Sequence, residues 1–400
     1  MPFSTLGLSP SILQAVAEQG YDKPTEIQRK AIPIILDGKN LIAAAQTGTG
    51  KTASFVLPIL EQLSRGQTQR KKRIRALILV PTRELAIQVN ENIQAYGKHL
   101  NLTSLAMYGG VDYAPQKQAL IDGVDILVAT PGRLIDLYGQ HSVHFDEVEM
   151  LVLDEADRML DMGFIEDINK ILARLPENIQ NLLFSATLSN PVRELARTAI
   201  SDPEEIVIAK HQASKDSINQ YLITVDKDKK SALLSHLLTE RDWSQVLIFI
   251  GTKHGAAKLV SQLEKRGIAA EAIHSGRNQA SRARVLDEFK QGKVKYLVAT
   301  GVAARGIDID DLPCVINYDM PFPADEYVHR IGRTGRAGAK GEAVSLVSRD
   351  DFKNLCMIES RLGHLIKRQT VDGFTPQKEV PISILNYVPK HKREKQQDRD

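Results

Sequence analysis

The chain contains 400 residues, of which 42% are hydrophobic and 25% are charged, and its formal net charge is +3. Because this length exceeds what one ordinary hydrophobic core supports, two domains are expected. The nearly balanced charge means that any affinity for nucleic acid must come from a local basic surface. No apolar stretch approaches the ~20 residues that span a bilayer, and no basic-then-apolar signal opens the chain, so neither membrane insertion nor secretion is expected.

Cysteine usage favours a reducing compartment. The chain has 2 cysteines, Cys314 and Cys356, and neither sits in a metal-ligand spacing. A cytoplasmic protein is therefore expected.

Two helices are expected near the N-terminus. Ser9 or Ser11 is a candidate cap for a short helix that runs through residues 16–19, and a second helix covers residues 25–36. The segment GYDKPTEIQ lies between them and ends in Gln28. A Gln amide offers a donor and an acceptor together, which matches the edge of adenine. Taken alone, Gln28 is better explained as a surface residue of the helix.

Residues 45–52 read AQTGTGKT and nearly match the phosphate-loop pattern, with Ala45 where the first Gly is usual. An apolar strand at residues 40–44 precedes the loop, and residues 52–65 are expected to form a helix. Glycines let backbone amides converge on a polyphosphate, and the helix N-terminus adds its positive dipole. In this pattern Lys51 reaches the β and γ phosphates and Thr52 ligates magnesium.

Residues 151–157 read LVLDEAD, an apolar run that ends in carboxylates. Asp154 is the expected acidic partner for magnesium, and Glu155 is placed to orient or deprotonate an attacking water. The alternative is a glycine turn and an acidic strand end that bind no ligand. The two segments together predict a site for a nucleoside triphosphate, because both follow strands in the order that such a site requires.

Apolar runs then alternate with helical patterns, which predicts a parallel sheet with helices on both faces. Polar loops follow several of the strands: PTRELA from Pro81, Gly109-Gly110, TPGR from Thr130 and SAT from Ser185. The carboxyl ends of parallel strands share one edge of the sheet, so these loops should lie beside the phosphate loop. Thr82, Arg83, Thr130 and Arg133 are candidates to hold phosphates of a nucleic acid. The alternative is that each loop only caps a helix.

A polar stretch at residues 209–217 lacks periodicity and is expected to be a linker. The strand and helix alternation then begins again, but this half has neither a phosphate loop nor an acidic strand end. It carries instead HRIGRTGRAG, with Arg330, Arg333 and Arg336 spaced three apart. Arginines that a second domain presents to a γ-phosphate stabilise the charge of the transferred phosphoryl group. A solvated basic helix face is the alternative.

These motifs resemble those of the DEAD-box ATP-dependent RNA helicases. GYDKPTEIQ, AQTGTGKT, PTRELA, GG, TPGR, DEAD, SAT, FIGTK, VATGVAARGID and HRIGRTGR occur in the order of that family, over roughly residues 3–365. The opening segment FSTLGLSPSILQAVAEQGY is similar to the bacterial RhlE subgroup. The resemblance implies two RecA-like domains, 1–208 and 218–365, joined by the linker 209–217. An extension, 366–400, would follow and be largely disordered at its end.

The resemblance also implies roles for individual residues. ATP would be bound by Phe3, Tyr21, Gln28, Ala45, Gln46, Thr47, Gly48, Thr49, Gly50, Lys51, Thr52 and Asp308. Catalysis would use Lys51, Asp154, Glu155 and the finger arginines Arg333 and Arg336, with magnesium at Thr52 and Asp154, partly through water. The two domains would be coupled through Asp157, Ser185, Thr187, His329 and Arg330. RNA would lie along Pro81, Thr82, Arg83, Gly110, Thr130, Arg133, Thr252, Gln279, Arg282 and Thr300.

Two positions depart from the common family pattern. Many members have Asp after the Thr of the loop that here reads Thr300-Gly301-Val302, and many have HGD where this chain has His274-Ser275-Gly276. The first change could loosen a contact on the RNA side or a hydrogen bond within the loop. Neither change touches the phosphates, so ATP hydrolysis is still expected.

The expected cofactors are ATP and Mg²⁺, and the expected partner is RNA, as a single strand or short duplex. Aromatic residues make up 5% of the chain, which favours sequence-tolerant tracking of the backbone over base stacking. Proteins of ribosome assembly or RNA decay are open as partners, and a monomer is expected. An ATP-gated RNA clamp that does not unwind would carry the same motifs. A DNA translocase is expected to have further inserted elements, and a small-molecule kinase would not need the arginine cluster.

Overall fold

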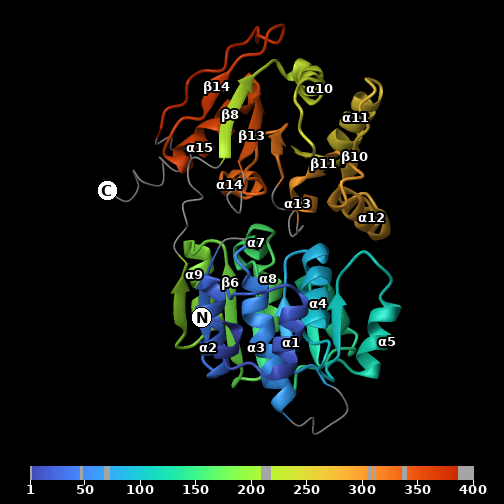
Figure 1. Ribbon diagram of the computed structural model, residues 1–400, viewed down its shortest axis with the longest axis vertical. Helices are drawn as coiled ribbons and strands as arrows, with labels where there is room; N and C mark the ends of the chain where they lie inside the picture. Colours follow the sequence, from blue (N-terminus) through green and yellow to red (C-terminus); the bar gives the residue numbers. More distant parts are fainter. Residues whose placement is uncertain are drawn as a thin grey trace. The chain divides into compact units, whose positions relative to one another are not determined.

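The structure is a computed structural model that describes residues 2–45, 48–66, 73–208, 218–304, 309, 312–335 and 340–385. The described chain divides into two compact units, residues 2–208 and the residues from 218 onward. Each unit contains one seven-stranded sheet whose strand pairs are parallel (Figure 1). The predicted architecture of two parallel sheets covered by helices is confirmed, and the two units are treated separately below.

The first sheet has the strand order β3-β4-β2-β5-β6-β1-β7. Its strands are β1 (Leu41–Ala44), β2 (Ala76–Leu79), β3 (Ser104–Met107), β4 (Ile126–Ala129), β5 (Met150–Leu153), β6 (Gln180–Ser185) and β7 (Glu204–Val207). Its helices are η1 (Phe3–Thr5), α1 (Pro10–Glu18), α2 (Glu26–Leu36), α3 (Lys51–Arg65), α4 (Arg83–Tyr96), α5 (Ala114–Asp122), α6 (Pro131–Gly139), α7 (Ala156–Asp161), α8 (Ile165–Leu172) and α9 (Asn190–Ala199).

Strands β2, β4 and β5 are apolar throughout because helices cover both of their faces. Successive side chains of a strand point to opposite faces, so Ile78 packs into one core while Leu77 and Leu79 pack into the other. Helices α1 to α4 supply the first core and helices α6 to α9 supply the second. This double layer of helices holds the strands, and therefore their ends, in place.

The second sheet has the strand order β10-β11-β9-β12-β13-β8-β14. Its strands are β8 (Ile218–Thr224), β9 (Val246–Ile250), β10 (Glu271–Ile273), β11 (Tyr296–Thr300), β12 (Cys314–Asn317), β13 (Gly341–Val347) and β14 (Lys367–Gln369). Its helices are η2 (Lys227–Lys229), α10 (Lys230–Glu240), α11 (Lys253–Glu264), α12 (Gln279–Lys290), α13 (Gly301–Ala304), α14 (Asp325–Ile331), η3 (Arg349–Asp351) and α15 (Phe352–Leu362).

The fold of the second unit continues past residue 365, where the sequence analysis placed the end of the domain. Strand β14 pairs in parallel with β8, from Lys367 opposite Tyr221 to Gln369 opposite Ile223. Further along, Val380 is buried in the core with Leu355 and Ile358 of α15. The described part of the extension is therefore packed against this unit. The disorder predicted for its end concerns residues that lie outside the described ranges.

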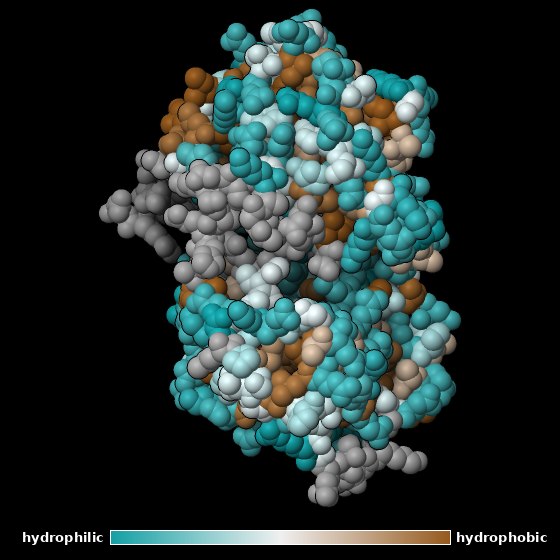
Figure 2. Space-filling view, viewed as in Figure 1, coloured by the Kyte–Doolittle hydropathy of each residue, from teal (hydrophilic) through white to brown (hydrophobic). Residues whose placement is uncertain are grey.

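One face of the molecule is mainly hydrophilic where its residues are described. Figure 2 shows hydrophilic residues over most of the face that it presents, with hydrophobic residues in small separate areas. Among the helices that the structure describes, none is long and apolar enough to cross a lipid bilayer.

Candidate nucleotide and nucleic-acid site

Three neighbouring strands of the first sheet end in the residues that predicted the nucleotide site. Strand β6 lies between β5 and β1, and all three are parallel. The phosphate loop follows β1, Asp154 and Glu155 follow β5, and Ser185 is the last residue of β6. Parallel strands end at one edge of the sheet, so the strand order alone brings the three segments together.

The phosphate loop depends on glycine at position 50. Gly48 and Gly50 have φ angles of 78° and 87°, in the left-handed region that favours glycine. A Cβ at Gly50 would overlap the Nε2 atom of Gln28. Helix α3 begins directly afterwards, at Lys51. The predicted contributions of Gln46 and Thr47 lie outside the described residues.

Gln28 joins the start of α2 to the phosphate loop. Its side chain is 4% exposed, so the alternative of a surface helix residue is wrong. Its Oε1 atom accepts from the backbone N–H of Thr25 at 2.8 Å, and its Nε2 atom donates to the carbonyl of Gly50 at 3.2 Å. One amide therefore ties the GYDKPTEIQ segment to the phosphate loop, while its contact with adenine stays a prediction.

Lys51 carries an ammonium group that the described protein does not satisfy. Its side chain is buried, and its Nζ atom has no hydrogen-bond partner in the part of the chain that the structure describes. A buried charge is costly unless a partner of opposite charge compensates it. A bound phosphate would supply such a partner, so this group fits the phosphate-binding role predicted for Lys51.

Asp154 is the buried carboxylate of the site. Burial raises its pKa to about 7, the Lys51 ammonium opposes the rise, and Glu155 adds to it. Its Oδ1 atom accepts from the backbone N–H of Glu155 at 2.9 Å.

Magnesium usually takes one or two protein oxygens and completes its shell with water and substrate phosphates. The Asp154 carboxylate and the Thr52 hydroxyl suit that pattern. In the described ranges no group of three or more His, Cys, Asp or Glu side chains could hold a metal by itself. The fit therefore requires oxygens from a nucleotide.

Glu155 adopts a left-handed backbone conformation, with a φ angle of 52°, at the start of α7. Its Oε2 atom accepts from the Nη1 atom of Arg158 at 3.1 Å, and both side chains are buried. The sequence analysis did not single out Arg158. The available signal was its place three residues after Glu155, a spacing that lets two side chains of a helix meet. The carboxylate predicted to act on water is thus held by a buried ion pair.

Asp157 connects the DEAD segment to the SAT segment. Its Oδ2 atom accepts from both the backbone N–H and the hydroxyl of Thr187, each at 3.0 Å. The hydroxyl of Ser185 donates to the Thr187 carbonyl at 2.7 Å. The structure therefore brings together the three residues of the first unit that were predicted to couple ATP to domain movement.

Strands β2, β4 and β3, on the other side of β5, end in the loops predicted to contact RNA. A Cβ at Gly110 would overlap the guanidinium of Arg83, and the φ angle of Gly110 is 78°. Arg133 donates from Nη2 to the carbonyl of Val111 at 3.0 Å. Arg83 and Arg133 therefore converge on the loop that contains Gly109 and Gly110, from two different strand ends.

Three further RNA candidates of this unit are buried at the starts of helices. Thr82 precedes α4, and its hydroxyl accepts from the backbone N–H of Leu85 at 3.3 Å, which is the capping role of the alternative interpretation. Pro81, the residue before Thr82, is buried, and so is Thr130, the residue before α6. Their contact with RNA stays a prediction.

The two aromatic residues predicted to flank adenine differ in exposure. Phe3 is 6% exposed and packs in the hydrophobic core of the first unit. Tyr21 is 42% exposed, and its hydroxyl lies 3.1 Å from the hydroxyl of Tyr96 on α4. Neither position tests the adenine contact, but Tyr21 offers the more accessible ring.

In the second unit, Arg330 is held by its own domain. Its Nη1 atom donates to the carbonyl of Asp319 at 3.0 Å and to Oδ1 of Asn317 at 3.4 Å. Its guanidinium lies over the ring of Phe249, 4.8 Å from the centroid, and its Nε atom is 3.5 Å from Oε1 of Glu326. These contacts give Arg330 a structural role within the second unit. Its predicted role in coupling the two domains stays a prediction.

The other predicted residues of this unit end strands or begin helices. Thr252 caps α11 by accepting from the backbone N–H of Gly255 at 3.0 Å, and Thr300 ends β11. Gln279 and Arg282 are buried on α12. His329 lies in α14 and Arg333 is buried just after it. Arg336 and Asp308 lie outside the described residues.

The structure shows the surroundings of both positions that depart from the family pattern, Gly301 and the segment from His274 to Gly276. A Cβ at Gly301 would lie 3.2 Å from Nη2 of Arg330 and 3.2 Å from Oε1 of Glu326, so a larger residue would crowd this ion pair. The Nδ1 atom of His274 accepts from the backbone N–H of Gly276 at 3.2 Å. Burial and, next, Arg277 lower the pKa of His274, which favours the neutral ring that this bond needs.

Comparison with known proteins agrees with this geometry. The model of the DEAD/DEAH box helicase family matches residues 25–195, and that of the helicase conserved C-terminal domain matches residues 228–338. DEAD-box ATP-dependent RNA helicase CshA of Bacillus cereus is 44% identical over 357 residues, which cover 89% of this chain and 67% of that protein. CshA of Geobacillus kaustophilus is 42% identical over 391 residues, covering 96% of this chain and 83% of that protein.

The solved structures show the same likeness. The structure of S. cerevisiae Dbp5 bound to RNA and ADP BeF3 has a TM-score of 0.82 at 33% identity and covers 93% of this chain and 96% of that one. A DEAD box protein of Methanococcus jannaschii has a TM-score of 0.53 at 41% identity and covers 92% of this chain and 99% of that one.

Two parallel sheets of this kind, the first with a phosphate loop and an acidic strand end, define a protein with tandem RecA-like domains. The chain belongs to the DEAD-box ATP-dependent RNA helicases, and it is an RNA helicase and ATPase. The finer resemblance to the RhlE subgroup is not confirmed by these relatives, which are named CshA.

Proposed function

We propose that the protein uses RNA-stimulated ATP hydrolysis to open short RNA duplexes locally, through closure of its two domains over ATP and one RNA strand. The observation that carries this proposal is that one edge of the first sheet presents both groups of candidate residues, those for the nucleotide and those for RNA. Strands β5, β6 and β1 end in the candidate nucleotide residues, and the adjacent strands β2, β4 and β3 end in loops that present Arg83 and Arg133. A nucleotide and a nucleic-acid backbone could thus be bound side by side on one rigid support.

In the nucleotide half, Lys51 binds the β and γ phosphates and Glu155 orients and deprotonates the attacking water. Asp154 and Thr52 would hold Mg²⁺, which when bound neutralises charge on the phosphate oxygens. Gln28 and Tyr21 contact the adenine. Three observations support these roles. They are the buried ammonium of Lys51, the ion-paired carboxylate of Glu155 and the hydrogen bond from Gln28 to Gly50.

In the second domain, Arg333 and Arg336 stabilise the charge that develops on the γ-phosphate, and Asp308 contacts the ribose. Thr252, Gln279, Arg282 and Thr300 extend the RNA path. Because these arginines act only after closure, hydrolysis should be slow without RNA. The first domain, 1–208, and the linker, 209–217, belong to this proposal. The second domain begins at residue 218 and is extended past residue 365 to include β14 and Val380.

RNA contacts on phosphate and 2′-hydroxyl groups make binding sequence-tolerant and let the protein distinguish RNA from DNA. The RhlE subgroup, a monomeric state, partners from ribosome assembly or RNA decay, and a cytoplasmic location remain further proposals. The proposed cytoplasmic location is supported by the free, buried thiols of Cys314 and Cys356.

The test is steady-state ATP hydrolysis at fixed salt with no nucleic acid, with single-stranded RNA, and with DNA of the same sequence. Stimulation by RNA alone is expected. Equal stimulation by DNA would favour a DNA translocase, and no stimulation would contradict the RNA path. Strand displacement of a short RNA duplex then separates a helicase from an ATP-gated clamp. Glu155→Gln should bind ATP and RNA without turnover, and rapid turnover would contradict the role of Glu155.

A further inference from the structure

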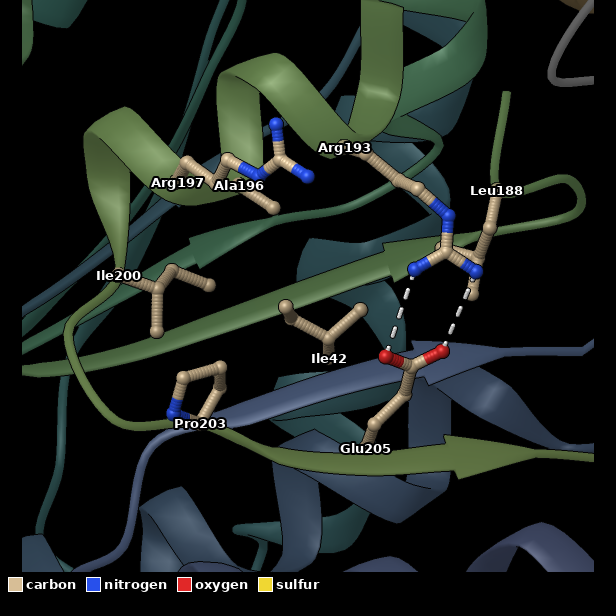
Figure 3. A pocket seen from close by; sticks show the side chains of 8 residues that line it. All are labelled: Ile42, Leu188, Arg193, Ala196, Arg197, Ile200, Pro203 and Glu205. Carbon is tan, nitrogen blue, oxygen red and sulfur yellow. Dashed lines mark hydrogen bonds and ion pairs between the residues drawn. The ribbon is translucent and has the colours of Figure 1, made fainter. Parts of the chain in front are cut away.

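A pocket outside the candidate site lies between helix α9 and the edge of the first sheet. Its volume is about 180 Å³. Figure 3 shows Arg193 and Arg197 on the helix side and Ile42, Pro203 and Glu205 on the strand side. The remaining lining residues are Leu188, Ala196 and Ile200. The pocket thus has an aliphatic floor and two guanidinium groups at its rim.

The rim has spare positive charge. Arg193 and Glu205 face each other in Figure 3 with both nitrogen to oxygen distances at 3.5 Å, and their side chains are 47% and 40% exposed. An exposed ion pair of this length contributes little to stability, so another carboxylate can replace Glu205 at low cost. Arg197 is exposed one turn further along α9 and has no hydrogen-bond or ion-pair partner among the residues that the structure describes. The rim therefore attracts a carboxylate.

The neighbouring strand offers unpaired backbone groups. Strand β7 is the last strand in the order of the first sheet, and within the described ranges it pairs only with β1. The backbone N–H groups of Glu204 and Ile208 donate to the carbonyls of Asn40 and Ala44, just before β1 and at its end, each at 2.9 Å. Backbone direction alternates along a strand, so the N–H and C=O groups of Glu205 and Val207 point away from β1. An extended chain can pair with such an edge.

The face of β7 beside the pocket carries the right side chains. Glu205 is the register partner of Ile42, so both lie on the face that α9 covers, and Val207 follows on the same face. Val207 is 56% exposed. On a strand added to β7, side chains two residues apart would share this face. A carboxylate could then reach the arginines while an aliphatic side chain enters the pocket.

We propose that the edge of β7 and the pocket under Arg193 and Arg197 bind an extended acidic peptide segment of a protein partner. The segment pairs with the outward backbone groups of Glu205 and Val207. It places an acidic side chain against Arg197 and an aliphatic side chain, two residues away, at the mouth of the pocket. The proposal does not depend on the nucleotide or RNA roles given above.

The test uses the full chain and a short fluorescent peptide, Thr-Glu-Thr-Ile-Thr-Glu-Thr, with both ends blocked so that its only charges are the carboxylates. Binding is followed by fluorescence anisotropy at low salt. Substitution of both Glu by Gln, or of Ile by Ser, is expected to weaken binding about tenfold or more, as loss of a charge-assisted or an apolar contact should.

Two protein variants test the two halves of the surface. Arg197→Glu should weaken binding of the Glu peptide about tenfold or more and leave the Gln peptide unchanged. Val207→Pro removes an outward N–H group without removing a bond to β1, and it should weaken binding of all the peptides. Lys170→Glu, an equal charge change at a side chain of α8 that is 52% exposed, should have no effect. Thermal melts and RNA-stimulated ATPase of each variant show whether the first unit is intact.

Three results would overturn the proposal. They are the absence of binding at about millimolar peptide, equal affinity for the Glu and Gln peptides, and binding that neither Arg197→Glu nor Val207→Pro changes. Sedimentation of the chain alone tests the other occupant. A dimer that Val207→Pro abolishes would mean that a second copy, rather than a partner peptide, occupies this edge.

Discussion

The backbone N–H and the hydroxyl of Thr187 both donate to one oxygen of Asp157, Oδ2, each at 3.0 Å. The second oxygen, Oδ1, accepts from the backbone N–H of Arg158 at 3.1 Å. One buried carboxylate therefore joins the segment after β5 to the segment after β6. A displacement of either strand end would be felt at the other, which makes this contact a means of linking nucleotide binding to events elsewhere in the first domain.

Thr187→Val tests that link, because valine keeps the shape and the backbone N–H but removes the hydroxyl. Loss of one hydrogen bond to a charged acceptor should lower the free energy of unfolding by about 1.5–3 kcal/mol. We expect ATP binding to be retained and the number of RNA duplexes opened per ATP to fall. Thr198→Val is the matched control, since among the described residues its hydroxyl bonds only to the carbonyl of Glu194, on the exposed side of α9. Equal unwinding per ATP in both variants would contradict the link.

Asp154→Asn should stabilise the protein without nucleotide at pH 8 and destroy its ATPase activity. Burial raises the pKa of Asp154 to about 7 in the folded state, from an ordinary value of 3.8. The ionised carboxylate therefore opposes folding above pH about 7, and this penalty declines as pH falls toward the ordinary value. The gain in melting temperature of the variant should be largest at pH 8 and small near pH 4. A gain that does not depend on pH would show that ionisation of the Asp154 carboxyl is not the cause.

Several features could be predicted from the sequence because they are local. Strands β2, β4 and β5 are continuous apolar runs, and Gly50 and Lys51 sit in a pattern whose geometry follows from glycine itself. The expected helix at residues 52–65 differs from α3 by one residue at its start. Strand β14 was missed because the residues Lys367–Gln369 are polar and show no alternation. They form a strand only because the free edge of β8 lies beside them.

The site contacts that sequence reasoning missed join residues far apart in the chain. Gln28 reaches Gly50, and Tyr21 reaches Tyr96, across 22 and 75 residues. Periodicity reports which face of an element is buried but not which loop faces it. The pairing of Arg158 with Glu155 could have been predicted, because Arg158 follows Glu155 by three positions at the start of α7.

Arg158→Met should destabilise the first unit through Glu155. The two side chains are 5% and 9% exposed, so removal of the guanidinium leaves a buried carboxylate unpaired, at a cost of roughly 3–5 kcal/mol. The double variant Glu155→Gln with Arg158→Met should recover part of this loss. Urea unfolding of the unchanged protein, Glu155→Gln, Arg158→Met and the double variant gives the coupling energy of the pair. A coupling energy near zero would mean that the ion pair does not form in solution.

Gly50→Ala should reduce ATP affinity, whereas Gly20→Ala should not. Both glycines have left-handed φ angles, 87° and 73°, so alanine at either costs about 1–2 kcal/mol in backbone strain. A Cβ at Gly20 has no neighbour within 4 Å, whereas one at Gly50 would displace the Gln28 amide from the phosphate loop. Both variants should therefore melt earlier, but only Gly50→Ala should weaken binding of a fluorescent ATP analogue, about tenfold or more. Equal affinities would show that the contact between Gln28 and Gly50 plays no part in holding the nucleotide.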